Sequence, residues 1–142
     1  MRVVIGSDAE GLSLKNIVKD ALVEGGHEVV DLSAEPATDF VDSALAVAQD
    51  VKANEGSLGF CFDGYGVGSY MVCTRVKGMV CANISDERSA YMTREHNNSR
   101  IVCMGANVVG PEVAKKIARE FLAADYAAGR HQVRVDMLDK MA

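Results

Sequence analysis

The stretch FCFDGYGVGSY, residues 60–70, combines a polar side chain and a backbone pattern that suit chemistry. An apolar run ends in Asp63, and glycines then alternate through positions 64, 66 and 68, with Tyr65 between the first two. Glycines let a backbone turn tightly and bring its N–H groups close to an anion. A nucleotide is disfavoured, because the stretch lacks the Lys-Ser or Lys-Thr pair of a Walker A loop and the spacing of a dinucleotide fingerprint. The alternative is a tight strand-to-helix turn that needs glycine only for its geometry.

The second half of the chain contains REHNNSR at 94–100 and GRHQVR at 129–134. Arg130 and Arg134 stand four residues apart, which on a helix places two guanidinium groups on one face and suits bidentate binding of phosphate. Solvated arginines paired with acids are the alternative, and spacing alone favours them. His96 could serve as a general acid or base, because imidazole titrates near neutrality. A lone histidine near a helix C-terminus more often complements the helix dipole.

The composition limits the partners of the chain. Fifteen Lys and Arg stand against 20 Asp and Glu, and the net charge of -5 gives no general attraction to nucleic acid or to an anionic membrane. The apolar runs are short and the first of them begins at the N-terminus, so we expect no targeting or membrane segment and a cytoplasmic location. The cysteines show no CxxC spacing, which indicates reduced structural thiols and no metal site. They are Cys61, Cys73, Cys81 and Cys103.

Short apolar runs alternate with segments of helical periodicity along the whole chain. The expected strands are RVVIGSD (2–8), HEVVDL (27–32), SLGFCFD (57–63), MVCANIS (79–85) and RIVCMGA (100–106). Apolar strands joined by helical crossovers form parallel sheets covered on both faces. The pattern therefore predicts a single α/β domain over residues 1–142, a Rossmann-like three-layer α/β/α fold with a five-stranded parallel sheet and a C-terminal helix. Sites in such folds lie at the carboxyl ends of the strands, where we expect Asp8, Asp63 and Ser85-Asp86 to meet.

Apolar stripes at helical spacing and capping residues indicate where the connecting helices begin and end. The first helix follows Gly11 and stops at Gly25-Gly26, another begins at Ser85-Asp86-Glu87, and a third begins at Gly110-Pro111-Glu112. The expected inward residues are Leu14, Ile17, Val18, Ala21 and Leu22, then Val41, Ala44, Leu45, Ala48 and Val51, and then Val113, Ile117, Phe121 and Leu122. The last segment, HQVRVDMLDKMA, has no strand after it, so we expect it to lie against a partner instead of completing the core.

Four stretches together resemble the family of ribose-5-phosphate isomerase B and the galactose-6-phosphate isomerase subunits. They are IGSDAEG (5–11), DGYGVGS (63–69), SDERSAYMTREHNNSRIVCMGANVVG (85–110) and AGRHQVRVDML (128–138). The resemblance covers nearly the whole chain. It implies an enzyme that interconverts aldose and ketose phosphates through a cis-enediol, in sites formed between two subunits, with no metal or organic cofactor.

The resemblance assigns roles to residues of this chain. His96 matches the histidine that opens the sugar ring, Asn97 an asparagine that binds the sugar, and Arg130 and Arg134 the arginines that bind phosphate. Asp8 matches one member of the other set, which bears the catalytic base.

The base-bearing set departs from the family. Asp63 stands where the family has its catalytic cysteine, Tyr65 where it has a threonine, Ala9 where it has a histidine and Val80 where it has an arginine. An ordinary Asp, with a pKa of about 3.9, is too weak a base to remove a proton next to a carbonyl unless burial raises that pKa. We expect the Tyr65 ring to narrow or fill the pocket.

The resemblance therefore implies one subunit of a hetero-oligomer that binds a phosphorylated sugar, while a related B subunit supplies the catalytic Cys loop. The implied reaction converts D-galactose 6-phosphate to D-tagatose 6-phosphate, in the tagatose 6-phosphate route of lactose and galactose breakdown. One alternative is a homo-oligomeric pentose- or hexose-phosphate isomerase that uses Asp63. The other is a non-catalytic scaffold that binds sugar phosphates.

Overall fold

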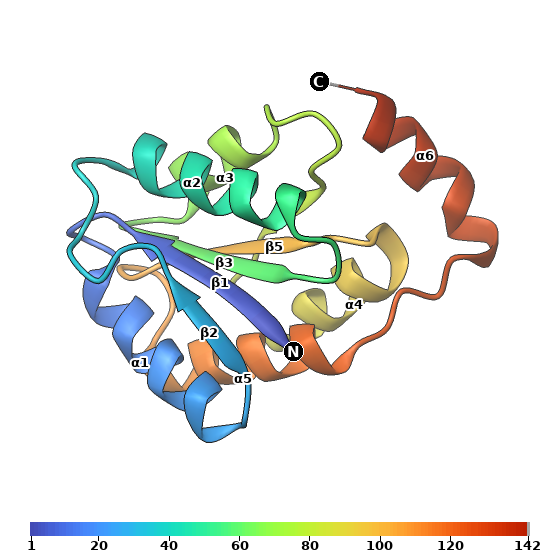
Figure 1. Cartoon of the computed structure of the whole chain (residues 1–142). Helices are drawn as coiled ribbons and strands as arrows, with labels where there is room; N and C mark the ends of the chain where they lie inside the picture. Colours follow the sequence, from blue (N-terminus) through green and yellow to red (C-terminus); the bar gives the residue numbers. More distant parts are fainter. Residues whose placement is uncertain (142) are drawn as a thin grey trace.

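The sheet has five parallel strands, in the order β2-β1-β3-β5-β4. A computed structural model describes residues 1–141 (Figure 1). The strands are β1 Arg2–Ser7, β2 Glu28–Asp31, β3 Leu58–Asp63, β4 Cys81–Asn83 and β5 Ile101–Gly105. Each lies within one of the five expected runs, so the predicted parallel sheet is confirmed.

Helices cover both faces of this sheet (Figure 1). One layer contains α1 (Leu12–Glu24), α4 (Glu87–Asn97) and α5 (Pro111–Ala123), and the other contains α2 (Phe40–Ala53) and α3 (Val67–Cys73). The 3-10 turn η1 (Gly129–His131) and α6 (Gln132–Lys140) follow at one end of the domain. The predicted α/β/α layering is therefore confirmed. Within residues 1–141, no helix has the length and apolar character needed to cross a membrane.

Two helices face the core with most of the expected stripe, but three of the residues expected inward are exposed. Val41 and Leu45 of α2 and Val113 of α5 are exposed. The buried stripes are Ala44, Val47, Ala48 and Val51 on α2, and Ala114, Ile117, Ala118, Phe121 and Leu122 on α5. A stripe at i, i+3, i+4 and i+7 fixes the inward face. Leu45 and Val113 lie about 100° from the centre of these stripes around the helix, whereas Val41 lies close to the stripe, three residues before Ala44, but in the exposed first turn of α2.

The cysteines pack in the core. All four are free and buried, and the Sγ atoms of Cys61 and Cys73 lie 3.8 Å apart. The pKa of the Cys103 thiol is raised by its contacts with the Cys61 and Cys73 thiols and by burial, so this thiol stays protonated. Their burial in the core agrees with structural thiols, and the expectation that they bind no metal stays a prediction.

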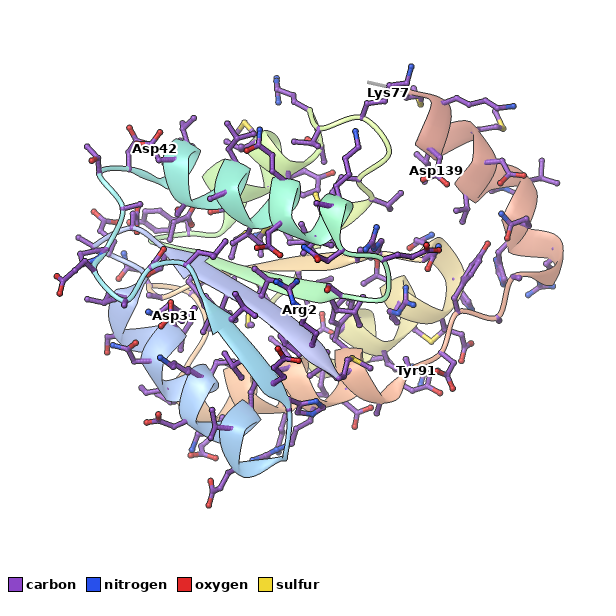
Figure 2. The ribbon with its side chains drawn as sticks, in the orientation of Figure 1. Arg2, Asp31, Asp42, Lys77, Tyr91 and Asp139 are labelled. Carbon is purple, nitrogen blue, oxygen red and sulfur yellow. The ribbon has the colours of Figure 1, made fainter. Side chains whose placement is uncertain are left out.

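A buried ion pair fixes the end of β2 beside α1. The Lys15 ammonium is fully buried and donates to Asp31 Oδ2 at 2.8 Å and to the Ser33 carbonyl at 2.6 Å. Asp31, labelled in Figure 2, also accepts from Lys19 at 3.0 Å. The Ser33 hydroxyl accepts from the backbone N–H of Ser7 at 3.0 Å, which connects this cluster to the carboxyl end of β1.

The C-terminal helix α6 stands apart from the two layers (Figure 1). Of its nine residues, all of which the structure describes, Val135 alone is buried. Asp139 lies on the side of α6 that faces the rest of the domain (Figure 2). Val133 and Met137 are exposed on α6. The expectation that this helix lies against a partner stays a prediction.

Candidate functional site

Two strand ends meet at the carboxyl edge of the sheet, as expected. Since β1 pairs with β3, Ser7 lies beside Phe62, and Asp8 and Asp63 follow on adjacent strands. Both line a hollow of about 350 Å³ together with Glu10. The Ser85-Asp86 pair does not line this hollow, because β4 is the far edge strand and Asp86 caps α4 by accepting from the backbone N–H of Ser89 at 2.7 Å.

The Asp63 carboxylate binds the glycine loop of its own chain. Its Oδ1 accepts from the backbone N–H of Tyr65 at 3.1 Å and from that of Gly66. Its Oδ2 accepts from the backbone N–H and the hydroxyl of Ser69, each at 2.9 Å. The residue is 4% exposed. The N–H groups that such a loop offers to an anion are therefore occupied by Asp63 itself.

The glycine at position 66 is needed for this arrangement. Gly66 has φ +81, and a Cβ placed there would collide with Asn83 Nδ2 and lie 3.0 Å from the Gly105 nitrogen. A tight turn that requires glycine for its geometry is thus confirmed at this position. The tight turn and the anion-binding pattern are both present, because the anion that the loop binds is its own Asp63 carboxylate.

Tyr65 borders the hollow and does not fill it. The residue is 64% exposed and lines the hollow with Phe40, Val67 and Met71. Asp8 is turned toward its own loop, where Oδ1 accepts from the backbone N–H of Gly11 at 2.9 Å. At this end of the sheet, therefore, the Asp63 carboxylate is hydrogen-bonded within its own chain and the Tyr65 ring is exposed.

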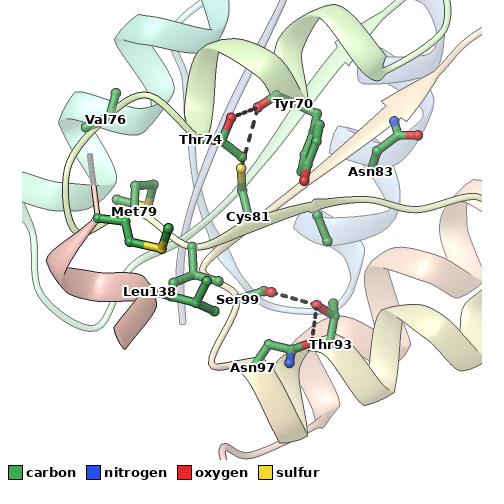
Figure 3. A pocket seen from close by; sticks show the side chains of 13 residues that line it. Tyr70, Thr74, Val76, Met79, Cys81, Asn83, Thr93, Asn97, Ser99 and Leu138 are labelled. Atoms are coloured by element: carbon green, nitrogen blue, oxygen red, sulfur yellow. Dashed lines mark hydrogen bonds between the residues drawn. The ribbon is translucent and has the colours of Figure 1, made fainter. Parts of the chain in front are cut away.

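The second set of residues lies on the last turn of α4 and on η1 and α6. Asn97 Oδ1 accepts from the Thr93 hydroxyl at 3.2 Å and lines a hollow of about 560 Å³ (Figure 3). Figure 3 shows Leu138 of α6 on another wall of this hollow. Val80 also lines it. Arg130 lies in η1 and Arg134 in the first turns of α6, so a 3-10 turn interrupts the simple helical spacing that the sequence suggested.

A histidine that the sequence analysis did not select completes this group. The rings of His96 and His131 stack with centroids 4.3 Å apart and planes 17° apart. The pKa of His131 is lowered by partial burial and then by the charges of His96, Arg130 and Arg134, while Glu95 opposes the shift. Its position between two candidate phosphate-binding arginines was the one signal in the sequence that could have identified it.

The two sets lie at opposite ends of the sheet. A crossover helix begins at the carboxyl edge and returns to the amino edge. Since α4 ends at Asn97 just before β5 starts at Ile101, His96 and Asn97 lie toward the amino edge. The segment after α5 also begins at that end, while the glycine loop lies at the other end (Figure 1). One copy of this chain therefore cannot bring both sets onto one small substrate.

Known proteins resemble the chain along its whole length. The model of a family described as Ribose/Galactose Isomerase matches residues 3–138. The galactose-6-phosphate isomerase subunit LacA of Streptococcus mutans is 55% identical over 99% of both chains. The LacA subunit of Streptococcus pneumoniae is 57% identical over 99% of both chains. That of Enterococcus faecalis is 54% identical over 100% of both chains.

Solved structures share the fold. Ribose-5-phosphate isomerase B of Clostridium thermocellum superposes with a TM-score of 0.94 at 35% identity, covering 98% of this chain and 95% of that one. The Mycoplasma genitalium ribose-5-phosphate isomerase B with bound ribulose-5-phosphate gives 0.92 at 36% identity, over 97% and 93% of the two chains.

Proposed function

The chain belongs to the ribose/galactose isomerase family, and on that basis we propose that it is the LacA-type subunit of a heteromeric galactose-6-phosphate isomerase. The reaction converts D-galactose 6-phosphate to D-tagatose 6-phosphate through a cis-enediol. The observation on which this rests most is the Asp63 carboxylate, which fills the anion-binding loop of its own chain. A partner chain must then supply an open loop and the base.

Each residue of the second set has a proposed role. His96 transfers a proton at the ring oxygen to open the sugar, and Asn97 hydrogen-bonds to the sugar. Arg130 and Arg134 bind the phosphate, for which their forked guanidinium groups are suited. A cysteine of the related B subunit removes the proton from carbon 2 and returns it to carbon 1. The position of this set, at the end of the sheet away from its own glycine loop, supports a site shared between two chains.

The proposal includes the setting of the enzyme. We take residues 1–142 as one isomerase domain that acts in the cytoplasm, where its free thiols stay reduced. The exposed side chains around the glycine loop, including Phe40, Tyr65 and Met71, offer an apolar surface to the B subunit.

The deciding experiment measures isomerisation of D-galactose 6-phosphate by the purified chain alone and after addition of a B subunit with the Cys loop. We expect activity only in the mixture. Activity of the chain alone at the rate of the mixture would contradict the shared site.

Two variants separate the alternatives. A homo-oligomeric enzyme that uses Asp63 predicts activity of the chain alone that is lost in Asp63→Asn. The four hydrogen bonds to this carboxylate disfavour that alternative, because its acceptor positions are already occupied. A non-catalytic scaffold predicts that His96→Ala leaves the mixture fully active. We expect His96→Ala to slow turnover of the closed-ring sugar more than that of an open-chain substrate.

A further inference from the structure

His131 lies outside the set of residues to which the proposed function gives a role, yet it is placed at the centre of that set. Its ring faces that of His96 at 4.3 Å and at an angle of 17°. It also lies between Arg130 and Arg134 in the chain. The stack therefore joins the proposed ring-opening group to the segment that carries the proposed phosphate clamp.

Few other contacts hold that segment in place. Residues 124–128, between α5 and η1, have no regular secondary structure, and α6 contacts the other described helices and strands sparsely, with Val135 buried and Leu138 beside the hollow near β4. The backbone N–H of Ala127 donates to the Glu95 carbonyl at 3.0 Å. The Tyr126 hydroxyl donates to Gln132 Oε1 at 2.9 Å, which is a contact inside the segment. Besides the buried Val135 side chain of α6, the contacts that join η1 to the end of α4 are thus the Ala127 hydrogen bond and the histidine stack.

Charges around His131 favour the neutral form of its ring. The charged and titratable groups that act on His131 are His96 and Glu95 from α4, Arg130 from η1 and Arg134 from α6. Glu95 Oε1 lies 3.5 Å from His96 Nε2. The pKa of His131 is lowered by partial burial and by the positive neighbours, so His131 is neutral at neutral pH and presents an uncharged aromatic face to His96.

We propose that His131 is a positioning residue for the isomerisation. Its ring supports His96 and holds Arg130 and Arg134 against the end of α4, so that the ring-opening group and the phosphate clamp act on one substrate molecule. This inference rests on the proposed function. The feature that matters is the flat face of the ring and not its nitrogen atoms.

The kinetic test uses His131→Ala and His131→Phe in the complex with the B subunit, with His27→Phe as the matched control on β2's side of the domain. His131→Ala loses the face, and we expect kcat/KM to fall roughly tenfold to a hundredfold, with kcat lowered and KM raised, because small misplacements of reacting groups are costly. His131→Phe keeps the face and should remain within about threefold of the unsubstituted chain. The inference is overturned if Ala is harmless or if Phe is as damaging as Ala.

A second measurement needs no activity and no substitution. The chain contains three histidines, so NMR of the full chain resolves its imidazole protons, and we expect cross-relaxation between the rings of His96 and His131. Absence of that contact would overturn the inference even if His131→Ala failed to fold. An inactive mixture of unsubstituted subunits would instead refute the proposed function and leave the contact standing.

Discussion

Replacing Asp63 by Asn tests whether this carboxylate stabilises the loop or acts as a base. The substitution keeps the shape and one oxygen, but puts an NH₂ group where one carboxylate oxygen was. If the NH₂ group takes the place of Oδ2, the backbone N–H of Ser69 loses its acceptor, while the Ser69 hydroxyl can rotate to accept. A buried donor left without a partner costs about 1–3 kcal/mol. The two bonds to Oδ1 also lose their charge assistance, so the total loss is about 2–5 kcal/mol.

The assay is urea unfolding of the isolated chain, with Asp20→Asn as a matched control for loss of one exposed carboxylate. We expect the control to change the unfolding free energy by less than about 0.5 kcal/mol. Asp63→Asn should also lower the melting temperature by roughly 5–15 °C. Equal stability of Asp63→Asn and the control would refute the role of Asp63 as an internal ligand of the loop.

The same variant has a kinetic expectation. In the complex with the B subunit, and below its melting temperature, Asp63→Asn should keep kcat within about threefold of the unsubstituted chain, because Asp63 does not touch the substrate in the proposed site. A loss of a hundredfold or more in a folded complex would restore Asp63 as a base.

Three further variants test the contacts described. The pKa of Asp31 is lowered: burial alone would raise it, but hydrogen bonds from Lys15, Ser33 and Lys19 outweigh burial. The ionised Asp31 therefore stabilises the folded chain fully above its unfolded pKa of about 3.9, and this stabilisation is lost as pH falls through its folded pKa. In urea unfolding, the free energy of unfolding of Asp31→Asn should therefore fall less steeply below about pH 4 than that of the unsubstituted chain. Gly66→Ala should cost about 1–3 kcal/mol in the same assay, because φ is +81 and the added Cβ meets Asn83. Replacing Arg130 and Arg134 together by Ala should raise KM of the complex at least about tenfold, from about 1.5–3 kcal/mol per charge-assisted hydrogen bond, and an unchanged KM would remove the phosphate assignment.

Much of the fold could be predicted from local patterns. All five strands are apolar runs bounded by turn residues, and Asp86 was correctly placed at the start of a helix because an acid there accepts from exposed backbone N–H groups. The expectation that Val41 faces inward is wrong because it lies in the exposed first turn of α2. The same expectation is wrong for Leu45 and Val113, since several registers of a helix with many apolar residues look equally apolar in sequence. Only packing against the sheet selects one of these registers.

The chemistry of the glycine loop could not be predicted in the same way. The sequence shows an acid beside glycines, and it does not show whether the carboxylate points outward or back onto the loop. That choice depends on donors at positions 65, 66 and 69, which converge only when Gly66 adopts its positive φ. The stack of His96 and His131 joins residues far apart in the sequence. No local pattern links them.

The separation of the two sets explains why a filled loop does not prevent activity under the proposed function. Two related chains can pair so that the glycine-loop end of each chain lies against the α4–η1 end of the other. Two composite sites then form. In one site, the open loop of the partner meets His96, Arg130 and Arg134 of this chain. In the other, the loop occupied by Asp63 meets the second set of the partner and offers no free N–H group to a substrate oxygen. Each pair then has one working site, and Asp63 stabilises a loop whose N–H groups would otherwise be buried without an acceptor.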